Sequence, residues 1–281
     1  MQLVQYVHQG ATRCGYADGD EIVGIDWTLR DALVLLAAGQ SERISDAHTL
    51  RVRRSDVVVL PPVLPSSRVF CIGINYLDHQ EESKDVFIAN VPEAPVVFLK
   101  DLTSVSGPDD ELVLPQSLSV QFDWEAELGV VIGAPARGVS QKAAWDVVAG
   151  YTVVNDISVR DRQLRHVQWT LGKNAPASSP IGPGIVARDT IGVDPDIELT
   201  SRVNGEVMQH AWTRDLIFDI PRLIEEISAV TPLLPGDIIA TGTPAGVGFK
   251  RNPPRYLTEG DVVDVEIAGV GLLSNRVRTE C

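Results

Sequence analysis

Short runs of alternating apolar and polar residues dominate the chain, and they predict strands more often than helices. Within the first 60 residues we expect strands at residues 3–7 and 21–25, and a helix from residue 29 to about residue 38. Thr28 and Asp31 have the spacing of a capping box, which supports a helix start at this point. The pattern therefore predicts a small N-terminal α/β domain.

A proline-rich stretch at residues 60–65 can continue neither a helix nor a central strand, so it is typical of a linker. We place the domain boundary there, with a small N-terminal domain at 1–62 and a second domain at 63–281. Asn204-Gly205 predicts a hairpin turn, and helices are expected at 141–147 and 220–230, capped by Ser140 and Asp219. The second domain is otherwise built of expected strands, at 68–74, 95–99, 122–132, 150–157, 197–203, 237–241 and 261–267. Because strands do not alternate regularly with helices, the predicted class is α+β, mainly β, with mixed and mostly antiparallel sheets.

Three acidic residues interrupt one of the most apolar expected strands, at every second position. Successive strand side chains point to opposite faces, so Asp123, Glu125 and Glu127 would share one face. Packed carboxylates repel one another and are costly to desolvate unless a cation lies among them, and hard divalent metals prefer oxygen ligands. The alternative is a strand with one face in water, and the alternation alone does not separate the two interpretations.

Composition narrows the possible partners. The chain has 281 residues with 44% hydrophobic and 22% charged residues, which is typical of a globular protein. A formal net charge of −14 has the wrong sign for binding nucleic acid or an anionic membrane surface. The N-terminus lacks the features of a secretion signal, so we expect a cytoplasmic protein. Cys14, Cys71 and Cys281 are too few and too scattered for a disulfide framework, and Cys71 is expected to be a small buried hydrophobe.

A second set of chemical groups follows the expected strand at 68–74. His79 and Glu82 are three residues apart, so on one helical turn they would face each other. A carboxylate beside an imidazole orients it and raises its basicity, as a general base that activates water requires. The alternative is a surface ion pair.

Weaker signals lie further along the chain. Asp156 is acidic within an apolar run, which a third metal ligand or a strand-end cap would explain. Lys173 precedes a stiff turn at 180–184, and a lone lysine is most often a solvated charge. The glycine-rich run 241–248 lacks the lysine of a P-loop and the helix of a dinucleotide fingerprint. We expect its amides and hydroxyls to hold an anionic substrate.

Taken in order, several segments resemble the fumarylacetoacetate hydrolase family over about residues 65 to 278, including its acylpyruvase and 2-hydroxyhepta-2,4-diene-1,7-dioate isomerase-like members. The order and spacing of the segments carry the resemblance more than any one of them. They are 73–76 with His79 and Glu82, 95–100, 123–128, 155–156 with 160–163, 172–173, 180–183, 203–205, 234–237, 241–248 and the tail 259–271.

The resemblance implies a mixed β-sandwich roll, preceded by a small N-terminal domain, and a homodimer. It also implies a divalent metal, Mg²⁺ or Mn²⁺ with Ca²⁺ possible, bound by Glu125, Glu127 and Asp156. Asp123 would lie just outside the metal ligands. In the implied roles His79, Glu82 and Lys173 are catalytic, and the substrate-binding residues are Arg160, Gln163 and Thr243.

The implied reaction is cleavage of a carbon–carbon bond in a β-diketone acid such as an acylpyruvate, giving pyruvate or a related keto acid and a carboxylic acid. Oxaloacetate decarboxylation, and isomerisation or hydration of a 2-hydroxydienedioate, would use the same enolate and are the alternatives. One departure affects the choice, because family members typically carry Asp-Thr-Phe where this chain has Pro176, Ala177 and Ser178. That change predicts an unusual substrate or weak activity, or a relative that binds metal and keto acid with little turnover.

Overall fold

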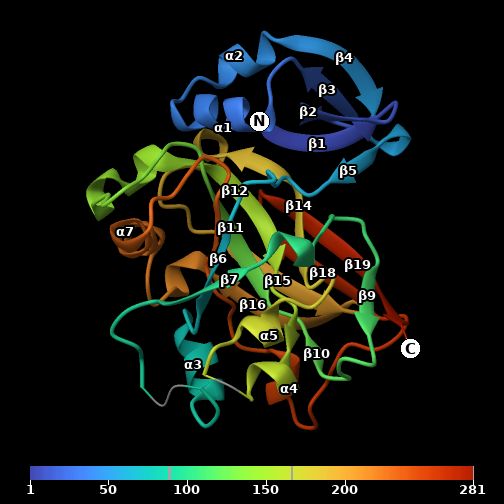
Figure 1. The fold of residues 1–281 in the computed structure, drawn as a ribbon, viewed down its shortest axis with the longest axis vertical. Coiled ribbons are helices and arrows are strands. Elements are labelled where there is room, and N and C mark those ends of the chain that lie inside the picture. The colour runs from blue at the N-terminus through green and yellow to red at the C-terminus, as the bar shows by residue number, and fades with distance from the viewer. Residues whose placement is uncertain (88–89, 166, 281) are drawn as a thin grey trace.

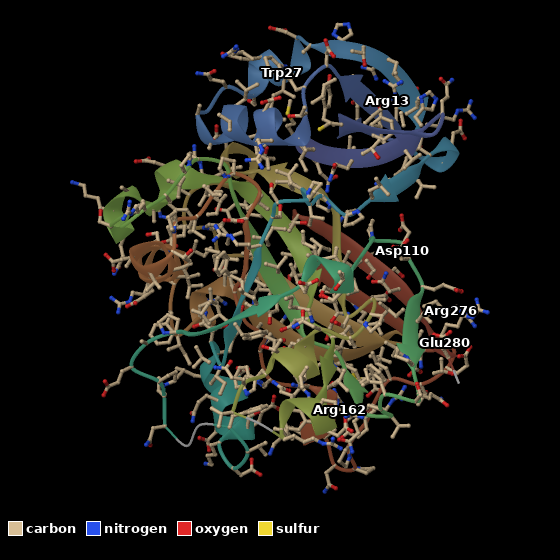
Figure 2. All side chains as sticks on the ribbon, viewed as in Figure 1. Arg13, Trp27, Asp110, Arg162, Arg276 and Glu280 are labelled. Atoms are coloured by element: carbon tan, nitrogen blue, oxygen red, sulfur yellow. The ribbon has the colours of Figure 1, made fainter. Side chains whose placement is uncertain are left out.

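The computed structural model describes residues 1–87, 90–165 and 167–280, so Cys281 lies outside the described residues. Two sheets form the body of the molecule, with the N-terminal module at one end and the short helices α3, α4 and α5 at the other (Figure 1). Arg13 and Trp27 mark the N-terminal end, and Arg162 marks the opposite end (Figure 2). The expected class, α+β and mainly β, is confirmed.

The large sheet runs in the order β4-β3-β2-β1-β14-β12-β11-β17-β6-β7, and β5 and β8 are added beside β1 and β14. Because β1 pairs with β14, strands of the N-terminal module and of the rest of the chain share this sheet. Its strands are β1 (Gln2–His8), β2 (Ala11–Asp18), β3 (Glu21–Ile25), β4 (His48–Arg53), β5 (Val58–Leu60), β6 (Val69–Gly73), β7 (Val96–Lys100), β8 (Val105–Ser106), β11 (Ala126–Ile132), β12 (Val148–Asn155), β14 (Ser179–Ala187) and β17 (Ile238–Ala240).

A second sheet packs against the first and has the order β16-β15-β18-β19-β9. The expected hairpin at Asn204-Gly205 joins β15 to β16. The strands of this sheet are β9 (Leu112–Pro115), β15 (Glu198–Val203), β16 (Glu206–Trp212), β18 (Val262–Ile267) and β19 (Gly271–Glu280), and a separate pair is formed by β10 (Phe122–Asp123) and β13 (Ser158–Val159).

The helices are short, and in the described part of the chain none is long and apolar enough to cross a membrane. The α-helices are α1 (Leu29–Ala37), α2 (Ser41–Ser45), α3 (Leu77–Ser83), α4 (Arg160–Gln163), α5 (Thr170–Lys173), α6 (Arg188–Ile191) and α7 (Ile220–Val230). The 3₁₀ helices are η1 (Arg54–Asp56), η2 (Leu102–Ser104), η3 (Gln141–Val147), η4 (Thr213–Asp215) and η5 (Gly248–Lys250).

Cap residues account for the helices that the sequence predicts correctly. The Thr28 hydroxyl accepts from the Asp31 amide at the start of α1, and the Asp219 carboxylate accepts from the Arg222 amide at the start of α7. The expected helix at 141–147 is a 3₁₀ helix instead, and the Ser140 side chain makes no cap bond. The free amide of Gln141 donates to Glu225 of α7, so a tertiary contact replaces the expected cap.

Alternate residues along a strand are buried in two different hydrophobic cores. In β11, Leu128, Val130 and Ile132 face the core between the sheets, while Val131 faces a second core beneath α1. β2 and β4 lack a comparable pattern, because much of each strand is exposed, and the sequence did not predict them. Cys71 is fully buried, as expected.

Five strand ends meet at one edge of the large sheet. β11 begins there, and its antiparallel neighbours β12 and β17 end there. β6 runs parallel to β17 and ends at the same edge, while β14 begins there as the antiparallel partner of β12. Loops that follow these ends therefore converge, and their side chains can form one site.

Asn75, two residues after the end of β6, joins these loops. Its amide donates to the carbonyls of Phe218 (3.0 Å) and Thr241 (2.7 Å), and its oxygen accepts from the Phe218 amide (2.8 Å). We expect Asn75→Ala to lower the free energy of unfolding by about 1–3 kcal/mol, because it leaves buried backbone groups unpaired. Urea denaturation measures this, with Gln116→Ala at an exposed amide as the control. Equal stability of both variants would contradict the assignment.

Candidate functional site

The three carboxylates expected to bind metal lie together at the converging strand ends. One oxygen of each of Glu125, Glu127 and Asp156 lies within 4.8 Å of the others, and all three residues are buried. The alternative of a strand face in water is therefore wrong for this segment. Glu127 belongs to β11, Glu125 lies just before it, and Asp156 follows β12.

The expected single strand at 122–132 is also wrong, because Trp124 and Glu125 separate β10 from β11. β10 pairs with β13, whereas β11 pairs with β12, so the chain changes partner between them. The break keeps the backbone of Glu125 paired: its amide donates to the Asn155 side chain (3.1 Å) and its carbonyl accepts from the Asp156 amide (2.9 Å). The acidic residues gather through this bend and not through strand alternation alone.

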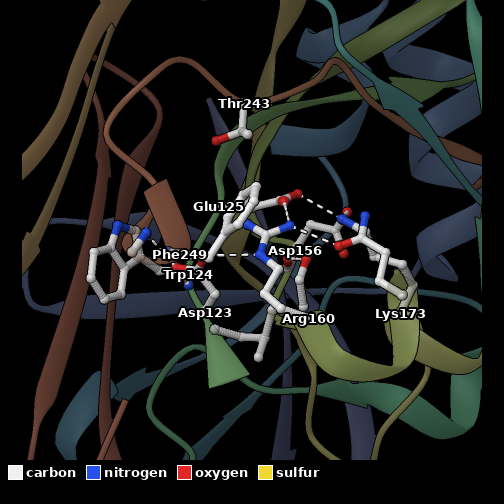
Figure 3. A network of polar contacts seen from close by, with 12 residues as sticks. Asp123, Trp124, Glu125, Asp156, Arg160, Lys173, Thr243 and Phe249 are labelled. Carbon is white, nitrogen blue, oxygen red and sulfur yellow. Dashed lines mark hydrogen bonds and ion pairs between the residues drawn. The ribbon is translucent and has the colours of Figure 1, made fainter. Parts of the chain in front are cut away.

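Arg160 of α4 and Lys173 of α5 hold Glu125 from two sides (Figure 3). Arg160 Nη1 lies 2.7 Å from Glu125 Oε1, and Lys173 Nζ lies 2.7 Å from both Glu125 Oε2 and Asp156 Oδ2. Arg160 Nε donates to Asp123 Oδ2 (2.8 Å), so Asp123 takes part through the arginine and lies beside the carboxylate trio. All of these groups are almost completely buried.

Sequence reasoning missed Lys100 as a member of the site. Its ammonium is buried at the end of β7 and donates to Asp156 Oδ1 (2.6 Å) and to the Ile157 carbonyl (3.1 Å). The segment 95–100 did contribute to the family resemblance, but only as a strand. A charged residue at the end of an apolar strand was the available signal.

The electrostatic environments of the three carboxylates differ. Burial raises the pKa of Glu127 well above its ordinary value, and the negative charges of Asp156 and Glu125 add to that effect. Burial also acts to raise the pKa of Glu125, but Lys173, Arg160 and His79 outweigh it and the net pKa is lowered. The pKa of Lys173 is raised, because the attraction of Asp156 and Glu125 exceeds the cost of burial.

These residues fit a hard divalent cation. The buried cluster contains four carboxylates, from Asp123, Glu125, Glu127 and Asp156, and three cations, from Lys100, Arg160 and Lys173. With all four carboxylates ionised, the cluster would carry one more negative charge than positive charge, and the raised pKa of Glu127 reflects the cost of that fourth buried charge. An oxygen-only donor set with excess negative charge suits Mg²⁺, Mn²⁺ or Ca²⁺.

His79 and Glu82 form the expected pair on α3, with 2.8 Å between His79 Nδ1 and Glu82 Oε1. His79 is 3% exposed and lines the same small cavity as Glu125, Glu127 and Lys173. The pair is therefore not a surface ion pair. Nδ1 faces Glu82, so Nε2 is the nitrogen left to act on a substrate or water.

The glycine-rich run 241–248 differs from the expectation that its amides hold an anionic substrate. The backbone amides of three glycines donate instead to the protein's own carboxylates: Gly242 to Glu127 (3.0 Å), Gly246 to Glu82 (3.2 Å) and Gly248 to Asp123 (2.7 Å). A side chain at Gly248 would collide with the Arg255 carbonyl and Asp123, which explains the glycine there. The run thus orients the acidic groups.

The three expected substrate-binding residues occupy different positions. Gln163 and Thr243 line the cavity beside the carboxylate trio. Arg160 is engaged by Asp123, Glu125 and Gln163, and its guanidinium lies 4.4 Å from the Phe249 ring centroid. In this arrangement Arg160 positions Glu125 and Gln163.

The chain departs from the family pattern at residues 176–178, and two side chains of the segment 174–178 hold the loop that carries Lys173. The Ser178 hydroxyl donates to the Lys173 carbonyl (3.3 Å), and the Asn174 side chain bonds the Asp101 amide and the Leu99 and Thr170 carbonyls. Hydrogen bonds between the Ser178 and Asn174 side chains and the backbone therefore hold the loop of Lys173 in the absence of the Asp and Thr side chains.

Comparisons with known proteins agree with this site. The family model described as fumarylacetoacetate (FAA) hydrolase C-terminal matches residues 68–278. The chain is 40% identical over 242 residues to the mitochondrial oxaloacetate tautomerase Fahd2a of Rattus norvegicus, covering 86% of this chain and 76% of the relative. It is 42% identical over 224 residues to the oxaloacetate tautomerase YisK of Bacillus subtilis, covering 79% and 74%.

Solved structures give the same result over the full length. A putative HpcE protein from Mycobacterium smegmatis superposes with a TM-score of 0.86 at 36% identity, and all of both chains is covered. Maleylpyruvate hydrolase from Sphingobium sp. SYK-6 superposes with a TM-score of 0.81 at 30% identity, again with full coverage. From the family match, these identities and the site geometry, the chain belongs to the fumarylacetoacetate hydrolase C-terminal family.

Proposed function

We propose that this protein is a metal-dependent enzyme that acts on a 2-keto acid through its enol, with keto–enol tautomerisation of oxaloacetate as the reaction. The supporting observation is Lys173 Nζ, 2.7 Å from both Glu125 and Asp156, which puts a buried cation beside the carboxylate trio. The relatives named oxaloacetate tautomerases favour this reaction over the hydrolysis that the sequence alone favoured.

Glu125, Glu127 and Asp156 would hold the metal, which we propose to be Mg²⁺ or Mn²⁺, with Ca²⁺ as a third candidate. When bound, such a cation polarises a keto oxygen and so makes the neighbouring carbon more acidic. With a divalent cation the buried cluster changes from one excess negative charge to one excess positive charge. That charge suits an anionic keto acid.

Two groups of the chain would carry the proton chemistry. Tautomerisation removes a proton from C3 of the keto acid and places one on the C2 oxygen. His79, oriented by Glu82, would take the C3 proton on Nε2 and return it to the C2 oxygen. The Lys173 ammonium would stabilise the negative charge that develops on the oxygen, in a site where burial strengthens the interaction.

A second candidate is hydrolysis of an acylpyruvate, and the His79–Glu82 pair favours it specifically. A buried imidazole oriented by a carboxylate can take a proton from water as well as from carbon. The water oxygen would add to the distal carbonyl, the carbon–carbon bond would break, and the electron pair would remain on the pyruvate enolate. A protein that binds metal and keto acid with little turnover is the non-enzymatic alternative.

The reaction can be identified with a substrate panel. After treatment with chelator, we expect added Mg²⁺ or Mn²⁺ to restore rapid loss of the ultraviolet absorbance of enol-oxaloacetate, with no release of carbon dioxide or pyruvate. Metal alone in buffer gives the uncatalysed rate. Pyruvate formation from acylpyruvates would favour the hydrolase, pyruvate with carbon dioxide from oxaloacetate would indicate decarboxylation, and no turnover would contradict an enzymatic function.

The metal ligands can be tested separately from the reaction. We expect Glu125→Ala and Glu127→Ala each to abolish Mn²⁺ binding in calorimetry and to reduce activity to the background rate, since two carboxylates cannot replace the trio. Glu206→Ala, at an exposed position on the β15–β16 hairpin, is the control. Turnover by either variant in metal-free buffer would show that the assignment is wrong.

His79 has a distinct expected phenotype. His79→Ala should lower kcat by about 10²–10⁴-fold, the usual contribution of a general acid or base, while Mn²⁺ affinity stays within about twofold. Glu82→Gln should lower kcat less, because the imidazole remains. Pre-steady-state kinetics and calorimetry measure both quantities, and undiminished turnover by His79→Ala would exclude it as the base.

The remaining sequence expectations stay predictions. They are the boundary after residue 62, the homodimer and the cytoplasmic location. A small keto acid is the proposed partner, in keeping with the family.

A further inference from the structure

Two hollows share a wall of aromatic side chains. The catalytic cavity beside the carboxylates is only about 10 Å³, roughly the room that one water requires. A groove of about 610 Å³ lies beside it. The residues that line both are Phe87, Phe98, Gln163 and Trp169.

Trp169 is the central piece of this wall. Its ring centroid lies 5.4 Å from that of Phe87 and 5.5 Å from that of Phe98. The edge of the indole rests on Gly73 at the end of β6, so closely that a Cβ there would lie 2.2 Å from Trp169 Cζ3. Gly73 therefore makes room for the indole, which lines both the cavity and the groove.

The rest of the cavity wall is fixed more firmly. Glu125 and Lys173 are buried in ion pairs, and Glu127 belongs to a central strand. Trp169 and Phe87, by contrast, are partly exposed, lie outside the strands and meet through ring contacts. Since about 10 Å³ cannot hold a keto acid, some part of the wall must move to admit one, and the aromatic side is the least constrained.

Beyond Trp169, both apolar and polar side chains line the groove. Val86, Val97 and Leu164 give it an apolar lining, and the polar groups of Arg165 and Gln168 also line it. A groove of about 610 Å³ with apolar side chains along it has room for an aryl or alkyl substituent. The groove is thus placed to receive what is attached to C3 of a keto acid whose carboxylate and keto oxygens face the metal ligands.

We infer that Trp169 determines which C3 substituent the site accepts: seated on Gly73 it restricts turnover to short keto diacids, and displaced it opens the groove to aryl and acyl substituents. This inference rests on the proposed function and specifies its substrate class. Trp169 also begins the turn that leads to Lys173, so its position is coupled to that of a catalytic side chain.

Oxaloacetate and phenylpyruvate test the inference, because both tautomerise at C3 and differ there in a carboxylate against a phenyl group. We expect Trp169→Ala to raise the ratio of kcat/KM for phenylpyruvate to that for oxaloacetate by at least about 10-fold, and Trp169→Phe to raise it less. Gly73→Ala should raise the ratio with the indole still present, because the new methyl group displaces it. Trp27→Ala, which removes a partly exposed indole at the far end of the molecule, should leave the ratio unchanged.

Binding keeps the test independent of turnover. With Mg²⁺ present, calorimetry gives the dissociation constants of oxalate and of phenylpyruvate. Trp169→Ala should lower the ratio of the phenylpyruvate constant to the oxalate constant by a factor similar to that expected for kcat/KM. If the wild type turns over neither substrate, the proposed function fails, while a shifted binding ratio still supports the role of Trp169. Unchanged ratios in folded Trp169→Ala, Trp169→Phe and Gly73→Ala, checked by circular dichroism, would overturn the inference.

Discussion

Three buried carboxylates, from Asp123, Glu125 and Asp156, lie within ion-pair distance of three buried cations, and the geometry of the site depends on that cluster. A buried charge is tolerable only when paired, and removing one partner of a buried pair typically costs about 3–5 kcal/mol. Each charge therefore constrains the element that carries it. The loop before β11, the end of β12 and helices α4 and α5 are held together because none of their charged groups can be left alone.

Backbone topology makes the cluster possible. Antiparallel neighbours in one sheet bring the start of β11 and the ends of β12 and β17 to the same edge, although they are far apart in sequence. The glycine-rich run after β17 then gives its amides to Glu127, Glu82 and Asp123. Those amides orient the three carboxylates, so the loop supports the acidic groups of the site and leaves substrate contact to side chains.

Features that depend on neighbouring residues could be predicted from the sequence, whereas features that depend on residues distant in the chain could not. Caps at Thr28 and Asp219 are local and gave correct helix starts, and the mainly β class followed from period-two runs. Alternation singled out Glu125 and Glu127 but predicted a straight strand, since the change of partner at Trp124 depends on β13, which lies more than 30 residues later. Lys100 was missed for the same reason: its partner, Asp156, is distant in sequence.

The contrast between local and long-range signals also applies to function. The sequence indicates the kind of intermediate, but it does not select the reaction. Charged residues give strong sequence signals, and in the proposed function those of this site would stabilise an enol or enolate, which tautomerases, hydrolases and decarboxylases of keto acids all require. Choice among these reactions depends on what surrounds the enolate: whether water reaches His79, and what can lie at C3. Here that boundary is made by Trp169, Phe87 and Phe98, partly exposed aromatic residues whose spacing carries no periodic signal. The charged groups of the site can thus be found from the sequence, whereas the packing on which we propose that the choice of substrate depends appears only when the chain is folded.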